Sequence, residues 1–380
     1  MKHLMTAPAE IALTQRQSSR ISINGRFLAR RPTGVDRFAY ELVRSIDQLL
    51  ESDDAAAAGL QVELLVPGGV KLERDAFSRI TVRSLPGGGQ LWEQFVLPFA
   101  ARGTLLLNLC NTGPLFVREQ VTVLHDAAPV RVPEAYKRAF RAWYSIMAPC
   151  IGRVARRVLT VSEFSRREIE QAYRIPPSKI GVIPESGEHM LRDELISDVH
   201  RRHQIGAKPY VLAVGSASRH KNFALLLEAI ELIGSADFEF VIVGGSMSVF
   251  QTVGLKLPNG VKHLGYVSDT DLKSLFRQAA CFVCPSLYEG YGLPPVEAMT
   301  LGCPVIASNL PSIREACGDA ARYVSPKSAS ELAATITEVM GSDELRNRMC
   351  LLGLEQAGRS SWRNSAITLL HEISPWLARA

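Results

Sequence analysis

Short apolar runs rich in β-branched residues alternate with longer segments of helical period along nearly the whole chain. Seven runs precede residue 185 and five follow residue 209: ISIN, VELLVP, ITVRS, TLLLNL, VTVLHD, VLTVS and IGVIP, then YVLAVG, FEFVIVGG, VKHLG, CFVCPS and PVIAS. Each strand-helix-strand repeat needs a crossover, which makes neighbouring strands parallel and places helices on both faces of the sheet. The sequence therefore predicts an α/β fold with two Rossmann-like, doubly wound domains facing a cleft.

The division between the two sets of runs falls in residues 185–209, which are rich in charge and carry no strand pattern. Domain boundaries favour exposed polar segments that few contacts cross. We therefore expect a first domain at 20–190 and a second at 191–360, preceded by a flexible extension at 1–19. A chain of 380 residues is long enough for two such domains.

Composition favours a globular cytoplasmic protein. Hydrophobic residues make up 47% and charged residues 21% of the chain, and no window approaches the roughly 18 apolar residues of a membrane span. The N-terminus lacks the apolar run of about 7 to 15 residues that signal peptides carry. Residues 1–190 hold 25 Lys and Arg against 19 Asp and Glu, whereas the remainder holds 18 against 19. The first half is therefore the basic one.

Much of the basic excess lies in residues 136–158, where Lys and Arg interleave with large apolar side chains. A basic amphipathic helix of this kind can lie on an anionic membrane surface or meet a phosphorylated acceptor. The other interpretation is a solvated helix whose apolar stripe packs on the core. The side chains concerned are Lys137, Arg138, Arg141, Arg153, Arg156 and Arg157, with Tyr136, Phe140, Trp143, Tyr144, Ile146 and Met147.

Seven scattered cysteines, an odd number, suit a reducing compartment. Cys281 and Cys284 have a CxxC spacing, but the segment ACFVCPS is predicted to be a buried strand. Residues three apart on a strand point to opposite faces, so the two thiols are not expected to share a metal.

Polar residues that follow strands are candidate ligand contacts, because open α/β sheets bind ligands beyond the carboxyl ends of their strands. In the second half, YVLAVG ends at Gly215 and continues through Ser216 to Arg219, His220 and Lys221 at the start of a helix. The exposed amides of a helix N-terminus favour an anion there, whereas cations alone are unfavourable. We therefore interpret this basic turn as a phosphate site.

The stretch YEGYGLPPVEAMTLG contains two glutamates that need explaining. Glu289 precedes a loop whose glycines allow close backbone approach to a ligand, and Glu297 lies in the helix that follows. Loop amides and the helix N-terminus provide a second anion site, and carboxylates accept hydrogen bonds from sugar hydroxyls. Phosphates flanked by two sugars fit this layout, so we predict a nucleotide-sugar ligand.

These segments, EGYGLPPVEAMTLGCPVIAS and VGSASRHKN, resemble the donor half of retaining glycosyltransferases of family 4, which have the GT-B fold. The first half agrees, because INGRFLARRPTGVDRFAYELVRSI, VLHDAAPVRVPEAY and LTVSEFSRREI resemble other motifs of that family. The resemblance runs from about residue 20 to about residue 372. It implies that 20–190 binds the acceptor, that 191–360 binds the nucleotide sugar, and that 361–380 is a helix crossing back to the first domain.

The resemblance also implies roles for individual residues. Glu297 would bind the nucleotide ribose, and Glu289 would contact hydroxyls of the transferred sugar. Lys221, with Arg219 or His220, would neutralise the diphosphate. The remaining donor-site residues would be Gly215 and Ser216, the amides of Gly290, Tyr291, Gly292 and Leu293, and Val267 beside the base.

In the first domain, the resemblance places Thr33, Gly34 and Val35 near the diphosphate or the acceptor, and His125 with Asp126 near the anomeric centre. The sequence departs from the family in two places. His220-Lys221 stands where Arg-Lys is common, and Glu185, Ser186, Gly187 and Glu188 replace the usual Asn-Gly-Val-Asp after the strand IGVIP. The role of that second segment is therefore left open.

The resemblance implies a reaction without a cofactor or metal ion, because lysine, arginine and helix-terminal amides can stabilise the departing diphosphate. In the retaining reaction a leaving-group oxygen can take the acceptor proton, with Asp126 as general base the less favoured alternative. The expected donor is GDP-mannose, with UDP-glucose, other UDP-hexoses and dTDP-rhamnose as alternatives. The expected acceptor is a polyprenyl-diphosphate-linked saccharide in bacterial surface polysaccharide synthesis, met peripherally at the inner face of the cytoplasmic membrane.

Other classes fit less well. A nicotinamide dehydrogenase needs GxGxxG after a strand with an acid about 20 residues on, which neither half supplies. A phosphorylase of this architecture would hold pyridoxal phosphate on a lysine near the end of the chain, and no lysine follows Lys327. A catalytically silent nucleotide-sugar binder would lack a paired glutamate or the phosphate lysine, and both are present. No nucleic-acid partner is expected.

Overall fold

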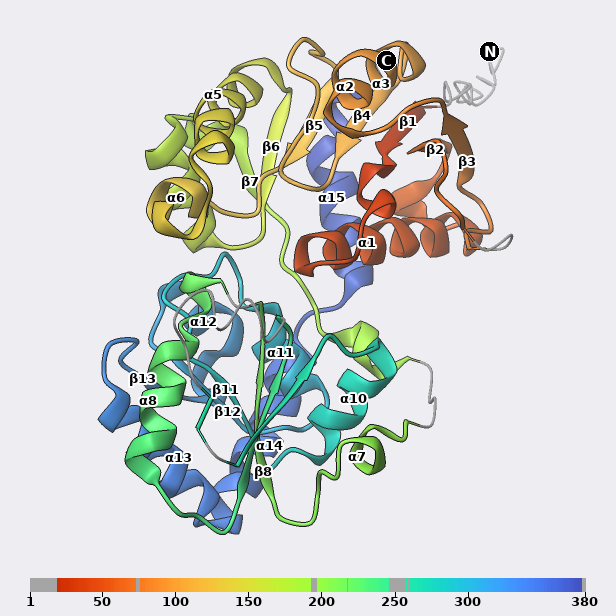
Figure 1. Cartoon of the computed structure of the whole chain (residues 1–380). Helices are drawn as coiled ribbons and strands as arrows, with labels where there is room; N and C mark the ends of the chain where they lie inside the picture. The colour runs from red at the N-terminus through yellow and green to blue at the C-terminus, as the bar shows by residue number, and fades with distance from the viewer. Residues whose placement is uncertain are drawn as a thin grey trace, which may run out of the picture.

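Two parallel sheets organise the protein, which we describe from a computed structural model (Figure 1). The structure describes residues 19–72, 76–192, 197–216, 218–245, 257–258 and 260–377. Apart from Ser19, which begins β1, the predicted extension 1–19 lies outside these residues. The α/β fold with two doubly wound domains is confirmed, while the domain bounds stay a prediction.

The first sheet has seven parallel strands in the order β3-β2-β1-β4-β5-β6-β7. Its crossover helices are α1 (Gly34–Glu51), α2 (Gly89–Leu91), α3 (Leu97–Ala100), α4 (Ala128–Arg131), α5 (Arg138–Val154) and α6 (Glu163–Tyr173). The strands are β1 (Ser19–Asn24), β2 (Leu60–Pro67), β3 (Thr81–Leu85), β4 (Leu105–Asn108), β5 (Gln120–Val123), β6 (Arg157–Thr160) and β7 (Ile180–Val182).

The second sheet has six parallel strands in the order β10-β9-β8-β11-β12-β13. These are β8 (Tyr210–Val214), β9 (Glu239–Val243), β10 (Val261–Gly265), β11 (Cys281–Cys284), β12 (Val305–Ser308) and β13 (Ala321–Val324). The described helices that follow β7 along the chain are α7 (Val199–Arg202), α8 (Phe223–Ile233), α10 (Asp269–Gln278), α11 (Leu293–Thr300), α12 (Pro311–Cys317), α13 (Ala329–Met340), α14 (Asp343–Ala357) and α15 (Trp362–Leu377).

All twelve predicted strands are present, and one strand, β13, was not predicted. Its sequence is ARYV, in which only Ala321 and Val324 are buried. Arg322 and Tyr323 interrupt the apolar pattern, so no run marks the strand. Cys281 and Cys284 lie on β11 in two different apolar clusters, as expected for opposite faces of a strand. Burial raises the pKa of the Cys281 thiol to about 12 and of the Cys284 thiol to about 11.

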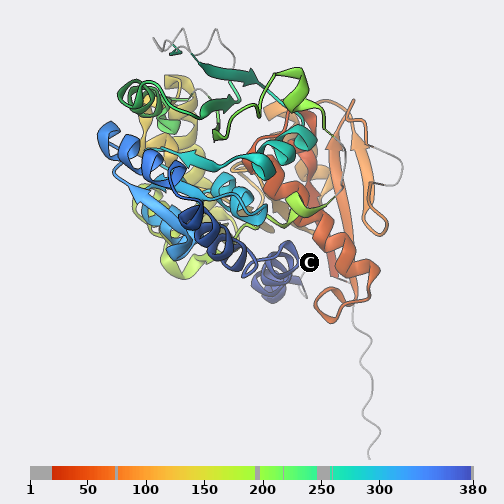
Figure 2. The same ribbon diagram turned by 90° about the horizontal axis from the view of Figure 1, so that it is seen from below.

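The last helix, α15, belongs spatially to the first domain. It packs along α1 and against β1, so the last described helix lies beside the first domain (Figures 1 and 2). Trp362 opens the helix and is only 1% exposed, with its ring edge-on to Phe38 of α1 at 5.8 Å. The connection at residues 358–361 and the segment after β7 therefore both pass between the domains.

None of the helices in the described part of the chain combines the length and apolar character that crossing a bilayer requires.

Candidate functional site

Both sheets reverse their strand order next to the first strand of the domain, between β1 and β4 and between β8 and β11. At such a switch point the two neighbouring crossovers diverge to opposite faces, which leaves a crevice beyond the carboxyl ends of the strands. Lys221 follows β8 and Glu289 follows β11, so the topology of the second sheet brings these two residues together.

Lys221 and Glu289 form a close, partly buried ion pair. Lys221 Nζ donates to Glu289 Oε1 at 2.7 Å, and Ser286 Oγ donates to the same oxygen at 2.6 Å. Burial alone would raise the pKa of Glu289, but the ammonium and the two hydrogen bonds outweigh burial and lower it. Burial likewise works against the charge of Lys221, and Glu289 reverses the effect, so the pKa of Lys221 is raised. Both groups are therefore charged at neutral pH.

The basic turn predicted from the sequence is a short 3₁₀ helix, Arg219–Lys221, which leads into α8 through Asn222. Asn222 adopts a left-handed conformation with φ of 56°, and its amide donates to Pro285 O and Pro326 O at 2.9 Å. These bonds tie the turn to the loop that follows β11. Arg219 is exposed, whereas His220 is half-buried, and burial followed by the charge of Lys221 lowers the pKa of His220.

The strand-end residues Gly215 and Ser216 lie beside this turn. Gly215 N donates to Val243 O at 3.0 Å, and an added Cβ on Gly215 would lie 3.5 Å from the Lys221 side chain. Ser216 is exposed. Val267, predicted beside the base, follows β10 and packs partly buried on the core of the domain. The structure thus groups Gly215 with the phosphate turn and places Val267 after β10, which is separated from β8 by β9.

The loop after Glu289 turns into α11 through Gly292, which has φ of +107° and therefore favours glycine. Two prolines occupy the first turn of α11, where a missing N–H is tolerated. Tyr291 is buried, and its hydroxyl donates to Glu185 O at 2.8 Å. The amides from Gly290 to Leu293 thus precede an eight-residue helix at the switch point.

Glu297 is buried in α11 and is held by a histidine that sequence reasoning missed. His189 Nε2 lies 2.9 Å from Glu297 Oε1, and Trp362 Nε1 donates to His189 Nδ1 at 3.3 Å. Because Nδ1 accepts from the indole, Nε2 carries the hydrogen that Glu297 accepts. The segment after β7, whose role the sequence left open, therefore supplies a hydrogen-bond partner to Glu297, the residue expected to bind the ribose.

His125 and Asp126 follow β5 in the first domain. His125 Nε2 lies 3.0 Å from Leu109 O and so donates to it, which leaves Nδ1 facing Glu185 Oε1 at 3.5 Å. Burial raises the pKa of Glu185, and His125 only partly offsets this effect. Asp126 Oδ1 accepts from Ala128 N at 2.8 Å, and burial raises the pKa of Asp126 as well.

The two halves of the site touch directly. Gly290 O accepts from Ser162 Oγ at 2.6 Å and from Ser165 Oγ at 2.9 Å, both at the start of α6. A Cβ on Gly290 would lie only 2.8 Å from His125 O, so the loop after Glu289 is seated on the first domain. The segment LTVSEFSRREI thus contacts the loop after Glu289.

Helix α5, the predicted basic helix, presents aromatic rings to this junction. Tyr136, Phe140 and Tyr144 stack in sequence, and the Tyr136 ring lies parallel to His220 at 6.3 Å. Met147 is buried, whereas Ile146 is 59% exposed. The apolar stripe of α5 is therefore only partly packed on the core, and Tyr136, which lies just before the helix, stacks on His220 of the second domain.

Thr33, Gly34 and Val35 begin α1 in the first domain. Thr33 forms a capping box with Asp36, and Arg30 pairs with the same carboxylate at 2.6 Å. Thr33 and Gly34 are exposed, while Val35 O accepts from Cys110 Sγ. One turn further on, Arg37 forms an ion pair across the domains with Asp269 at the start of α10. Arg37 was not predicted, although it follows TGVD directly.

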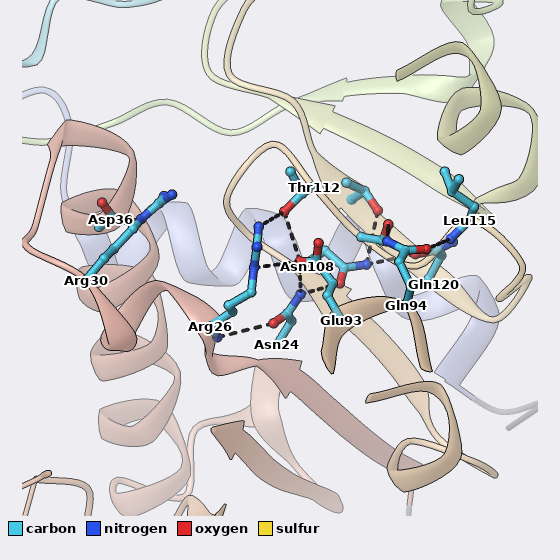
Figure 3. Close-up of polar contacts among 12 residues, drawn as sticks. Asn24, Arg26, Arg30, Asp36, Glu93, Gln94, Asn108, Thr112, Leu115 and Gln120 are labelled. Carbon is cyan, nitrogen blue, oxygen red and sulfur yellow. Dashed lines mark hydrogen bonds and ion pairs between the residues drawn. The ribbon is translucent and has the colours of Figure 1, made fainter. Parts of the chain in front are cut away.

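A pocket of about 190 Å³ occupies the switch point of the first sheet. Glu93, only 1% exposed, accepts from Asn24 and Thr112 at 2.9 Å and pairs with Arg26 at 3.1 Å (Figure 3). This network was missed, although Asn24 and Asn108 stand at strand ends where polar residues could have marked it. The lining residues are Asn24, Arg26, Phe27, Ala29, Arg30, Gly89, Glu93, Leu109, Cys110 and Thr112.

Within the described ranges, no group of three or more His, Cys, Asp or Glu side chains is arranged to hold a metal ion.

Comparison with known proteins places this geometry in a family. The family model described as glycosyl transferases group 1 matches residues 197–350. O-antigen chain mannosyltransferase B of Escherichia coli is 31% identical over 275 residues, which is 66% of this chain and 70% of that protein. O-antigen chain mannosyltransferase RfbU of Salmonella typhimurium is 30% identical over 234 residues, or 60% and 63% of the two chains.

Among solved structures, the sucrose-phosphate synthase of Thermosynechococcus elongatus superposes with a TM-score of 0.72 at 18% identity, covering 95% of this chain and 100% of that one. The similarity confirms the GT-B arrangement of two Rossmann-like domains. The family is shown by the sequence comparisons, namely the match to mannosyltransferase B over 70% of that protein and the family model in the second domain: the chain belongs to the group 1 glycosyltransferases and is an enzyme of that class.

Proposed function

We propose that this glycosyltransferase moves mannose from GDP-mannose to a saccharide acceptor with retention of anomeric configuration. The observation that carries the proposal is the Lys221–Glu289 pair at the switch point of the second sheet, next to His125 and Asp126. The sugar is suggested by the relatives, two of which are named as O-antigen mannosyltransferases.

Charge explains how the site would act. The bond between sugar and diphosphate breaks most easily when positive groups meet the negative charge that develops on the leaving oxygen. Lys221 would supply that charge together with the amides at the start of α11. Glu289, held in place by Lys221 and Ser286, would accept hydrogen bonds from the transferred sugar. This arrangement supplies the required stabilisation from side chains and amides without a metal ion.

Glu297 would bind the ribose hydroxyls, with His189 fixing its carboxylate. The Nε2–H of His189 occupies Oε1, which leaves Oε2 as the acceptor for a hydroxyl. Arg219 and His220 would stand at the diphosphate beside Lys221, and the stacked ring of Tyr136 would cover His220 from the first domain.

The acceptor is proposed to be a polyprenyl-diphosphate-linked saccharide of surface polysaccharide synthesis, met at the inner face of the cytoplasmic membrane. The pocket at the first switch point supports this part, because Arg26, Arg30 and Glu93 can serve phosphate and hydroxyl groups. Thr33, Gly34 and Val35 would lie beside the path by which the acceptor reaches this pocket.

The experiment is calorimetric titration with GDP, UDP, ADP and dTDP in the presence of chelator, repeated on Glu297→Ala. Binding of GDP alone, weakened in the variant, is the expected result. Selective binding of UDP or dTDP would replace the donor with a UDP-hexose or dTDP-rhamnose. Failure of all four nucleotides to bind would reject the donor-site assignment.

A transfer assay then tests retention. With GDP-mannose and a lipid-linked acceptor, the anomeric configuration of the product can be read by nuclear magnetic resonance. An inverted product would reject the retaining mechanism, and nucleotide binding without any transfer to the acceptors tested would favour a catalytically silent binder.

A further inference from the structure

Residues 89–100 form a helical segment whose inner and outer sides differ sharply. It runs through α2, the π-helical turn Trp92–Val96 and α3. On the inner side, Trp92 and Leu97 are buried in a cluster with Leu65 and Leu106. This inner packing holds the segment against the first sheet.

The outer side carries an exposed apolar stripe. Leu91, Phe95 and Phe99 recur every four residues and are 73%, 63% and 64% exposed. Residues four apart lie on one face of a helix, so the three side chains project together. The side chains needed for packing point inward, and this stripe adds nothing to the core.

The neighbouring loop extends the stripe. Gln94 Nε2 donates to Gly113 O at 3.1 Å, and Gln94 Oε1 accepts from Leu115 N at 3.0 Å (Figure 3). These bonds hold the loop beside the helix, and the next residue, Phe116, is 91% exposed. We refer to Leu91, Phe95, Phe99 and Phe116 as the apolar ridge.

Exposed charge around the apolar ridge is net positive, because Glu119, which follows Arg118, is paired with Arg156. Residues 89–118 contain three charged side chains, Glu93, Arg102 and Arg118. Glu93 is buried and pairs with Arg26 inside the pocket, whereas both arginines are exposed. The Arg102 guanidinium lies 4.4 Å from the centre of the Phe99 ring. Exposed aromatic groups beside the exposed Arg102 and Arg118 match the boundary between anionic headgroups and acyl chains.

We propose that the apolar ridge docks the protein on an anionic lipid bilayer. The inference rests on the proposed function, since a lipid-linked acceptor would be presented at that surface. Glu93 lines the acceptor pocket from the same helical segment that carries the ridge, so docking would hold that pocket one helix diameter, roughly 10 Å, from the headgroups. A symmetric contact between two copies through the ridge is disfavoured because it would bring like-charged arginines together.

The test compares binding to vesicles of phosphatidylglycerol and phosphatidylethanolamine with binding to phosphatidylcholine vesicles. The triple variant Leu91→Gln/Phe95→Gln/Phe99→Gln is expected to lose at least about tenfold in partitioning to the anionic vesicles. Leu351→Gln is the matched control, because Leu351 is 70% exposed on α14 of the other domain. Arg102→Gln/Arg118→Gln should remove most of the preference for anionic lipid.

Hydrogen exchange on the wild-type protein gives a local readout. Anionic vesicles are expected to slow exchange in residues 89–103 and 113–118. Wild-type binding by the triple variant, or protection confined to another surface such as α5, would overturn the proposal. A concentration-dependent dimer that the triple variant abolishes, without vesicle binding, would overturn it in favour of contact between copies.

Nucleotide titration of the triple variant without vesicles separates this inference from the proposed function. Retained nucleotide affinity with lost vesicle binding supports the ridge. Lack of nucleotide binding in the wild-type protein would reject the proposed donor site, and the vesicle experiment would still decide the ridge.

Discussion

At the scale of single residues, Lys221 carries the largest expected effect on catalysis. Lys221→Ala removes the cation at the proposed leaving group and leaves Glu289 buried without its partner. Loss of one such stabilising group lowers kcat by about 10²–10³-fold, measured as initial rates of transfer from GDP-mannose. Lys262→Ala is the control, because Lys262 forms an ion pair of 2.9 Å with Glu239 in the same domain. A kcat for Lys221→Ala equal to that of the control would reject the assignment.

A second residue-scale prediction concerns pH. Burial raises the pKa of Glu185 in the folded protein, so the native state holds this proton more tightly than the unfolded chain. The associated stability is present below the ordinary carboxyl pKa and is lost as pH rises through the raised value. Glu185→Gln imitates the protonated form, so its free energy of unfolding relative to the wild type should increase as pH rises above the ordinary carboxyl pKa.

Thermal melts across that range measure the difference for Glu185→Gln. Glu188→Gln is the matched control, since Glu188 is exposed in the same segment and accepts from Trp362 N. If the difference for Glu185→Gln changes with pH no more than the difference for the control does, burial does not raise the pKa of the Glu185 carboxyl.

At the scale of elements, α15 links the domain junction to the nucleotide site through Trp362. Trp362→Ala opens a cavity at a fully buried position and should lower the free energy of unfolding by about 3–5 kcal/mol. Trp362→Phe keeps most of the packing but removes the hydrogen bond to His189, so nucleotide affinity should fall while stability changes much less.

Chemical denaturation and nucleotide titration together check this split. Trp376→Phe is the control, because Trp376 lies half-buried near the end of the same helix, away from His189. If Trp362→Phe binds nucleotide as tightly as Trp376→Phe does, the helix acts only through packing and His189 does not position Glu297.

At the scale of the whole molecule, the sequence predicted the features that depend on local residue patterns, namely the strands and the residues that follow them. Buried β-branched runs marked twelve strands, and the order of those strands brings Lys221 to Glu289 because both follow neighbouring strands at a switch point. The partners of Glu297 and His125 lie in residues 185–189, which have no periodic pattern. These contacts depend on how the two domains pack together. The periodicity of apolar residues along the sequence carries no information about that packing.

The meeting of the domains leads to the last prediction. Gly290→Ala would place a methyl group 2.8 Å from His125 O and 3.1 Å from Asp126 Cβ, so the loop after Glu289 could no longer sit on the first domain. Because the loop amides are unchanged, nucleotide affinity should stay within about twofold while kcat falls at least about tenfold, as expected when closure completes the site. Gly68→Ala is the control, since its Cβ would meet nothing nearer than 3.4 Å at the end of β2. Small-angle scattering with nucleotide should show a larger radius of gyration for Gly290→Ala than for Gly68→Ala, and equal radii with equal kcat would mean that this contact does not control transfer.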